Sequence, residues 1–202
     1  MHQLQCKCGM VRGHINSEGL QSRLICYCTD CRAFARFLAG AAAEAGKGTG
    51  AGTILDAAGG TEIIQLAQSR LHFSSGEAQL MALKLTEKGM IRWYCQCCFT
   101  PIGNTLASPG GAFIGVIHSC LQPAKLDADF GVEVAQLNTN TALGTIKKRG
   151  LAGVLWRFLL IMIFERLSGR YRQSPLFSSE GVLRVVPRTL TKTELQQLKA
   201  AG

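Results

Sequence analysis

The sequence is short of acidic residues, aromatic residues and long apolar runs. Residues 1–13 contain no apolar core of the length that a signal peptide needs, so we predict no secretion signal and expect a cytoplasmic protein. The longest apolar stretch, within residues 147–171, is interrupted by Gly153 and Arg157 and is too short to span a bilayer. No internal repeat of about 20 to 50 residues is apparent. With 47% hydrophobic and only 17% charged residues, the chain is predicted to fold rather than to remain disordered.

The scarcity of acidic residues leaves a formal charge of +9, which is distributed unevenly along the chain. Residues 1–140 carry eleven basic against ten acidic side chains, whereas residues 141–202 carry eleven against three. We interpret residues 1–140 as one domain and residues 141–202 as a basic extension that is not an independent domain. The extension is either a solvated tail or a contact for an acidic partner, which would be nucleic acid, an acidic protein or an anionic membrane surface.

Between residues 4 and 134 the sequence contains short runs of β-branched, aromatic and alternating apolar residues. Glycine-rich turns separate these runs, which is the pattern of β-strands joined by short connections. The predicted fold class is therefore mainly β, an antiparallel β domain with a helical, basic extension at the C-terminal end. The predicted strands cover residues 24–25, 61–66, 70–74, 79–86, 91–94 and 112–118.

Two segments depart from the strand pattern. Residues 39–52 are almost entirely Ala, Gly and Thr, which predicts a flexible surface loop with room for one helical turn at 41–45. Residues 147–171 carry apolar side chains at helical spacing, which predicts an amphipathic helix. This helix either packs on the domain or on a second subunit, or lies in a membrane interface with Lys147, Lys148 and Arg149 near the headgroups.

The end of the chain carries two further signals. Residues 182–186 are rich in valine and predict a short strand. Thr191 and Glu194 have the spacing of a capping box, which predicts the start of a final helix.

Eight of the nine cysteines fall in three short groups, at 6–8, 26–31 and 95–98. In a chain without an export signal, grouped thiols indicate metal ligands or catalytic groups rather than a disulfide framework. Zinc takes four ligands in a tetrahedron, and two cysteine pairs from distant parts of a chain can close one structural site. We predict such a site from Cys6, Cys8, Cys95 and Cys98, with Cys97 as an alternative ligand to Cys95.

The middle group supplies three thiols, Cys26, Cys28 and Cys31, and no evident fourth ligand. Structural zinc sites are closed, while catalytic ones commonly keep one position for water or substrate. We therefore predict a second zinc ion at this group and regard these three cysteines as the catalytic residues. The alternative is that Cys97, Cys120 or His118 closes the site. No histidine or carboxylate is clearly placed as a general base.

With these motifs in hand, residues 4–135 resemble the glutathione-dependent formaldehyde-activating enzyme family, which includes the centromere protein V domain. The likeness rests on Cys6-Lys-Cys8-Gly9, on Cys26-Tyr-Cys28-Thr-Asp-Cys31-Arg32 and on Cys95-Gln-Cys97-Cys98, in that order. Within that family the chain looks closest to an uncharacterised bacterial branch. Three features depart from the family pattern. Phe99 stands where the family has glycine, so a different local turn is expected, and Cys97 adds a thiol. The basic helical extension lies outside the family core.

The resemblance implies a zinc-stapled β tent with a structural ion at Cys6, Cys8, Cys95 and Cys98. It implies that a second ion at Cys26, Cys28 and Cys31 handles a small thiol substrate such as glutathione or its formaldehyde adduct. The implied activity is that of a carbon–sulfur lyase. The rival hypothesis is a non-catalytic, zinc-stabilised binding module whose basic extension docks on nucleic acid, an acidic protein or a membrane surface. The oligomeric state is left open.

Overall fold

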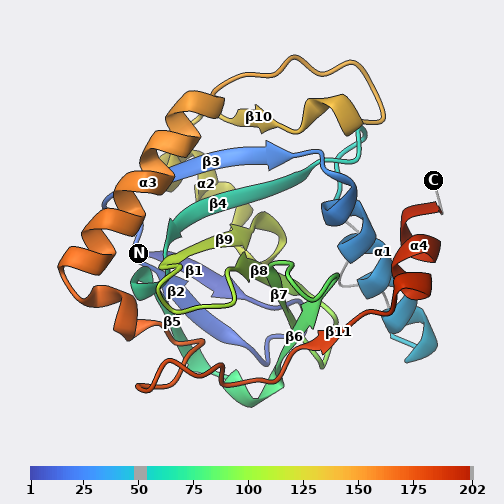
Figure 1. Cartoon of the computed structure of the whole chain (residues 1–202), viewed down its shortest axis with the longest axis horizontal. Coiled ribbons are helices and arrows are strands. Elements are labelled where there is room, and N and C mark those ends of the chain that lie inside the picture. Colours follow the sequence, from blue (N-terminus) through green and yellow to red (C-terminus); the bar gives the residue numbers. More distant parts are fainter. Residues whose placement is uncertain (48–53, 201–202) are drawn as a thin grey trace.

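The computed structural model describes residues 1–47 and 54–200, in which two β-sheets and four α-helices form a mixed α/β fold (Figure 1). The small sheet has the strand order β1-β2-β5, and the large sheet has the order β10-β3-β4-β9-β8-β7-β6-β11. The strands are β1 His2–Gln5, β2 Arg12–Ile15, β3 Gln21–Cys26, β4 Thr61–Ala67, β5 Leu71–Ser75, β6 Leu80–Lys84, β7 Ile91–Cys95, β8 Pro101–Thr105, β9 Phe113–Ile117, β10 Ala135–Leu137 and β11 Arg188–Thr189.

The six strand predictions coincide with β3, β4, β5, β6, β7 and β9, while β1, β2 and β8 escaped sequence analysis. Most neighbouring strands pair antiparallel, as predicted, but β10 pairs parallel with β3 and β11 pairs parallel with β6. The prediction of a purely antiparallel sheet is therefore wrong at both edges of the large sheet. The reason is that the late strands add to edges whose backbone groups would otherwise lack partners.

The four helices are α1 Thr29–Glu44, α2 Leu126–Phe130, α3 Leu151–Leu167 and α4 Lys192–Ala200. The prediction of a loop from residue 39 is wrong as far as Glu44, although the helical turn allowed at 41–45 coincides with the end of α1. Residues 48–52 of the predicted loop lie outside the described part of the chain. Phe34, Leu38 and Ala42 recur every four residues on the buried face of α1, so the alanines there serve helix packing.

The predicted helix within residues 147–171 is confirmed as α3, which lies along the β3, β4 and β9 side of the large sheet (Figure 1). The prediction that it is amphipathic is wrong, because large apolar side chains such as Trp156 and Phe164 are exposed on its outer face. Val154 and Ile161 are buried there, and the ring of Phe158 contacts that of Phe113 at 4.8 Å. Glu165, also buried, is 3.8 Å from the Arg170 guanidinium. Among the helices of the described chain, none is both long and apolar enough to cross a bilayer.

The C-terminal extension runs back across the domain. Leu176 and Phe177 are buried in the main core, and the hydroxyl of Ser174 donates to the side-chain oxygen of Gln68 at 2.5 Å. The predicted strand at 182–186 is wrong, because these residues make only an isolated bridge between Phe177 and Leu183. The predicted final helix is confirmed as α4, which lies against α1 (Figure 1).

The capping box is confirmed as well. The Glu194 amide donates to Thr191 Oγ1 at 3.2 Å, and the Thr191 amide donates to the Glu194 carboxylate at 2.7 Å. These reciprocal bonds satisfy backbone donors that a helix start otherwise leaves free.

Trp93 stands at the centre of the main core and is fully buried. Its indole Nε1 donates a hydrogen bond of 2.9 Å to Oγ1 of Thr105, which is equally buried on the neighbouring strand β8. A buried donor left without an acceptor costs about 1 to 3 kcal/mol. This pair therefore constrains how β7 and β8 pack, and both strands flank the turn that carries Cys97 and Cys98.

We predict that Thr105→Val lowers the free energy of unfolding by about 1 to 3 kcal/mol, because the indole N–H loses its acceptor at nearly constant side-chain volume. Urea denaturation measures the change as a shift in midpoint at constant slope. Thr86→Val, at an exposed position, is the matched control and should change stability by less than about 0.5 kcal/mol. Equal midpoints for the two variants would contradict the assignment.

Candidate metal centres

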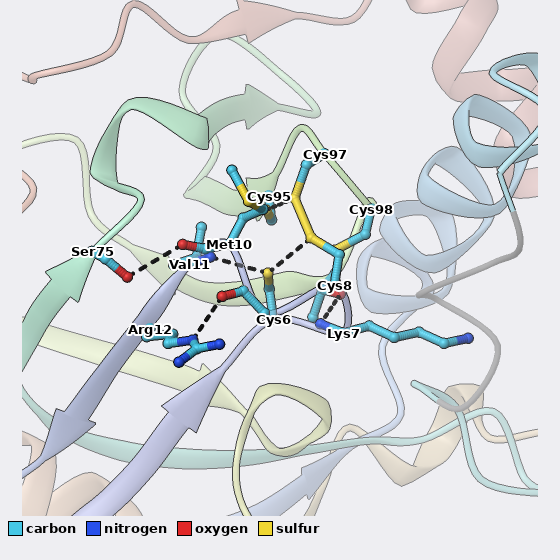
Figure 2. The surroundings of a disulfide bond; sticks show 12 residues. Cys6, Lys7, Cys8, Met10, Val11, Arg12, Ser75, Cys95, Cys97 and Cys98 are labelled. Atoms are coloured by element: carbon cyan, nitrogen blue, oxygen red, sulfur yellow. Dashed lines mark hydrogen bonds between the residues drawn. A yellow bond between two sulfur atoms is a disulfide. The ribbon is translucent and has the colours of Figure 1, made fainter.

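Five cysteine sulfurs converge between the start of the chain and the β7–β8 turn (Figure 2). The sulfurs of Cys6, Cys8, Cys95, Cys97 and Cys98 all lie within 4.8 Å of one another, an arrangement that could hold a metal ion. Sequence analysis predicted four of these as ligands and left Cys97 as the alternative to Cys95. The structure brings all five together, so both remain possible ligands.

Backbone contacts orient this group from both sides. The Val11 amide donates to Cys6 Sγ at 3.3 Å, which is the hydrogen bond that a thiolate on the first turn would accept. On the opposite side the Cys95 amide donates to the Thr100 carbonyl at 2.8 Å, and this bond closes the turn that presents Cys97 and Cys98. The group therefore connects two turns that are far apart in sequence.

Cys8 and Cys97 are paired as a disulfide, whereas the sequence predicts free thiols (Figure 2). Their Cα atoms are 7.2 Å apart, beyond the usual span of about 4.4 to 6.8 Å for a disulfide. Thiolates that share one zinc ion at about 2.3 Å have sulfurs about 3.8 Å apart and need no closer approach. The spacing of the backbones thus suits shared ligation of a metal by the reduced thiols.

Phe99 has a φ of 55°, in the left-handed region that favours glycine. The backbone here takes a conformation natural to glycine, and the expectation of a different local turn stays a prediction. The Phe99 ring stacks on Tyr94 with centroids 6.3 Å apart, and the Lys47 ammonium lies 5.8 Å from its centroid. These contacts hold the side chain in place and offset the cost of the backbone conformation.

The second group comprises Cys26, Cys28 and Cys31, whose sulfurs also lie within 4.8 Å of one another. Cys26 ends β3, and Cys28 is the N-cap of α1. The Cys31 amide donates to Cys28 Sγ at 3.3 Å, so the sulfur takes the place that a serine or aspartate oxygen usually occupies at a helix start. The positive end of a helix favours a thiolate at this position.

The three thiols differ in the direction of their pKa shifts. Hydrogen bonds from Cys28 and then Cys31 lower the pKa of Cys26 to about 2. The bond to Cys26 in turn raises the pKa of Cys28 and, together with burial, raises that of Cys31 well above its ordinary value. Cys26 is thus the sulfur that ionises first, and a metal ion that binds here displaces the remaining protons.

Asn138 completes the rim of this group, and sequence analysis missed it. Its side-chain amide donates to Cys26 Sγ at 3.2 Å, and its backbone has a φ of 55°. Asparagine tolerates this left-handed conformation better than most residues, and the sequence carries no other signal for it. Arg32 anchors the rim, because its guanidinium donates to the carbonyl oxygens of Tyr27 at 3.0 Å and Thr141 at 2.5 Å.

None of the three side chains considered as a fourth ligand lies in this group. Cys97 belongs to the five-cysteine group, and the Cys120 thiol donates to the Ile117 carbonyl at 3.1 Å. His118 Nδ1 lies 3.2 Å from the Glu62 carbonyl oxygen. Across residues 1–47 and 54–200, no fourth Cys, His, Asp or Glu joins the three thiols.

A narrow crevice behind Cys31 contains a buried cation. Arg92 is 6% exposed and lines this crevice with Cys31, Thr61 and Asn104. Its guanidinium lies over the Phe34 ring, 5.4 Å from the centroid, and bonds Asn104 Oδ1 at 3.4 Å. Within the described residues no carboxylate forms an ion pair with Arg92, so it places a buried positive charge in the crevice next to Cys31.

We predict that the reduced protein binds two zinc ions per chain, measured by mass spectrometric metal analysis after gel filtration. Cys28→Ser and the double variant Cys97→Ser/Cys98→Ser should each lower the count to one, because the first leaves two thiols in its group and the second leaves only three of five in the other. Only the double variant should also lose the folded state by circular dichroism, since its group joins distant turns. Cys120→Ser, a buried cysteine outside both groups, is the control and should keep two ions. Two ions retained by Cys28→Ser would contradict the assignment.

Comparison with known proteins leaves the reaction unnamed. No curated protein matches the sequence. Among solved structures, a Rhodobacter sphaeroides protein determined as a Northeast Structural Genomics target is 17% identical, with a TM-score of 0.42. That similarity covers 66% of this chain and 98% of the other. Residues 1–184 match the family described as "Family of unknown function (DUF6151)", and the chain therefore belongs to this family.

Proposed function

We propose that this chain is a zinc protein that handles a small thiol or its adduct, such as S-hydroxymethylglutathione, at Cys26, Cys28 and Cys31. The observation that carries the proposal is the convergence of three thiols without a fourth Cys, His, Asp or Glu in the described part of the chain. The resemblance of the cysteine motifs to the glutathione-dependent formaldehyde-activating enzymes supports a carbon–sulfur lyase reaction.

The three thiols suit zinc as donors. Zinc prefers sulfur and nitrogen ligands, and the helix start and the Asn138 amide both favour negative charge on the sulfurs. Zinc bound there would supply Lewis acidity and keep a substrate sulfur as its thiolate.

The surrounding residues position the group and balance its charge. The hydrogen bond from Asn138 to Cys26 withdraws charge from one sulfur and keeps residues 138–141 over the site. Arg32 joins the same segment to the turn between Cys26 and Cys28 through the Tyr27 carbonyl. Arg92 supplies a buried positive charge behind Cys31. None of the four histidines belongs to the group, so proton transfer falls to water or to the substrate thiol.

The five-cysteine group has a structural role in this proposal. In the reduced protein four of its thiols would close a zinc site between the first turn of the chain and the β7–β8 turn. Such a site contributes free energy to folding directly, because its ligands do not come together in the unfolded chain.

The lyase proposal predicts that the zinc-loaded protein accelerates exchange between glutathione, formaldehyde and their adduct, followed by NMR exchange spectroscopy. Cys28→Ser should return the rate to the uncatalysed value, because the second ion loses a ligand. Cys120→Ser should leave the rate unchanged. An uncatalysed rate in protein that carries two zinc ions per chain would refute the lyase proposal.

A second function is supported by the outward face of α3. Six large apolar side chains are exposed along it, with Trp156 at 60% and Leu167 at 82% exposure. Monomeric proteins rarely expose apolar surface of this extent without a partner. The side chains of this outward face are Leu155, Trp156, Leu159, Ile163, Phe164 and Leu167.

Basic side chains at both ends of α3 indicate which kind of partner its outward face binds. Lys147, Lys148 and Arg149 precede α3, while Arg166 and Arg170 lie at its far end. A second copy of the same helix would bring like charges together, whereas an anionic bilayer offers both an apolar interface and opposite charge. We therefore assign this face to the surface of an anionic phospholipid membrane, in preference to nucleic acid or an acidic protein.

The protein is accordingly predicted to float with vesicles that contain phosphatidylglycerol and to remain behind with pure phosphatidylcholine vesicles. Leu159→Glu should weaken binding about tenfold or more, because it removes an apolar contact from the interface. Val186→Glu makes the same charge change at an exposed apolar position outside α3 and should weaken binding much less. Binding to single-stranded oligonucleotides but not to vesicles would overturn the membrane assignment, as would dimerisation through α3 by analytical ultracentrifugation.

A further inference from the structure

An open cleft of about 820 Å³ lies beside the start of α3 and belongs to neither cysteine group. Its walls come from the first half of β3, from residues 130–135 and from the first two turns of α3. The polar side chains that matter most here are Ser22, Arg149 and Arg157. A cleft of this size takes a small organic molecule.

Ser22 is the first indication of a ligand. The residue is only 5% exposed, and its hydroxyl has no hydrogen-bond partner among residues 1–47 and 54–200. Ser22 alternates with Leu24 on the face of β3 that packs toward Val154 of α3, so its side chain faces the cleft. A buried hydroxyl without a partner is costly, and a group bound in the cleft would satisfy it.

The start of α3 is the second indication. Its N-cap is Gly150, which offers no side chain to the free amides of the first turn. Arg157 lies about two turns after Gly150, and its guanidinium reaches back by one turn, since a Cβ placed on Gly153 would be 3.5 Å from it. The guanidinium therefore lies back along the helix toward the same amides. Backbone amides and an arginine that converge at a helix start are a typical binding arrangement for phosphate.

The charges that face the cleft favour an anion. Arg149 lines it and its guanidinium donates to the Val134 carbonyl oxygen at 2.9 Å, while no carboxylate in the described part of the chain forms an ion pair with it. Arg23 also lines the cleft, but Glu62 and Asp127 neutralise it. Glu133 is the acidic residue of the lining and is exposed, so Arg149 and Arg157 leave a net positive charge.

We propose that this cleft binds the phosphate group of a small ester, through the free amides at the start of α3, Arg157 and the hydroxyl of Ser22. The ester is either a free phosphate metabolite or a phospholipid headgroup, since both present the same group. The site acts independently of zinc.

The test is an NMR titration of the full, ¹⁵N-labelled chain with inorganic phosphate, glycerol 3-phosphate and dihexanoyl phosphatidic acid at constant ionic strength. The amides of Leu151, Ala152 and Gly153 should shift saturably. Tighter binding of glycerol 3-phosphate supports a free ester as the ligand, and tighter binding of the phosphatidic acid supports a headgroup. Shifts that sodium chloride reproduces, or the absence of saturable shifts with all three probes, would overturn the proposal.

Variants separate the proposed contacts from general charge. Arg157→Ala should weaken binding of glycerol 3-phosphate about tenfold or more, whereas Arg172→Ala removes the same charge from an exposed position outside the cleft and should change it less than about twofold. Ser22→Ala should weaken binding without lowering the melting temperature, because it deletes a buried hydroxyl that has no partner among the described residues. Equal weakening by Arg157→Ala and Arg172→Ala, or unchanged binding in Ser22→Ala, would contradict the site.

Discussion

The antiparallel pairing of β3 with β4 is the constraint on which both candidate sites of the large sheet depend. It runs from Gln21 opposite Leu66 to Cys26 opposite Thr61 without a register shift. Because side chains alternate along a strand, this register places Ser22, Leu24 and Cys26 on one face. A slip by one residue would turn both the serine of the cleft and the first sulfur of the three-cysteine group away from their sites.

The two cysteine groups differ in how much chain they join. Cys26, Cys28 and Cys31 come together within one turn and the start of one helix, so they need little of the remaining fold. The five-cysteine group joins residues about ninety positions apart, and the entropy of closing so long a loop must be overcome before it forms. A ligand bound to the distant group therefore stabilises the fold, while one bound to the local group leaves it nearly unchanged.

The sequence revealed those parts of the structure that depend on local pattern. Strands with apolar alternation, the apolar spacing of α3 and the capping box at Thr191 are properties of neighbouring residues. Helix α1 escaped although alanine is the strongest helix former, because the Ala- and Gly-rich composition of residues 39–52 was given more weight than the spacing of Phe34, Leu38 and Ala42. Asn138 escaped because only the fold brings it to Cys26, 112 residues away. The parallel edges β10 and β11 escaped because strand direction is set by the path of the returning chain.

Strand β10 and the residue that follows it link the three-cysteine group to the start of α3 through hydrogen bonds. At one end Asn138 bonds Cys26, and in the middle the backbone of Gln136 bonds that of Arg149, just before α3 begins. The rim of the three thiols and the start of α3 are therefore parts of one hydrogen-bonded unit, and a displacement of either strains bonds that hold the other.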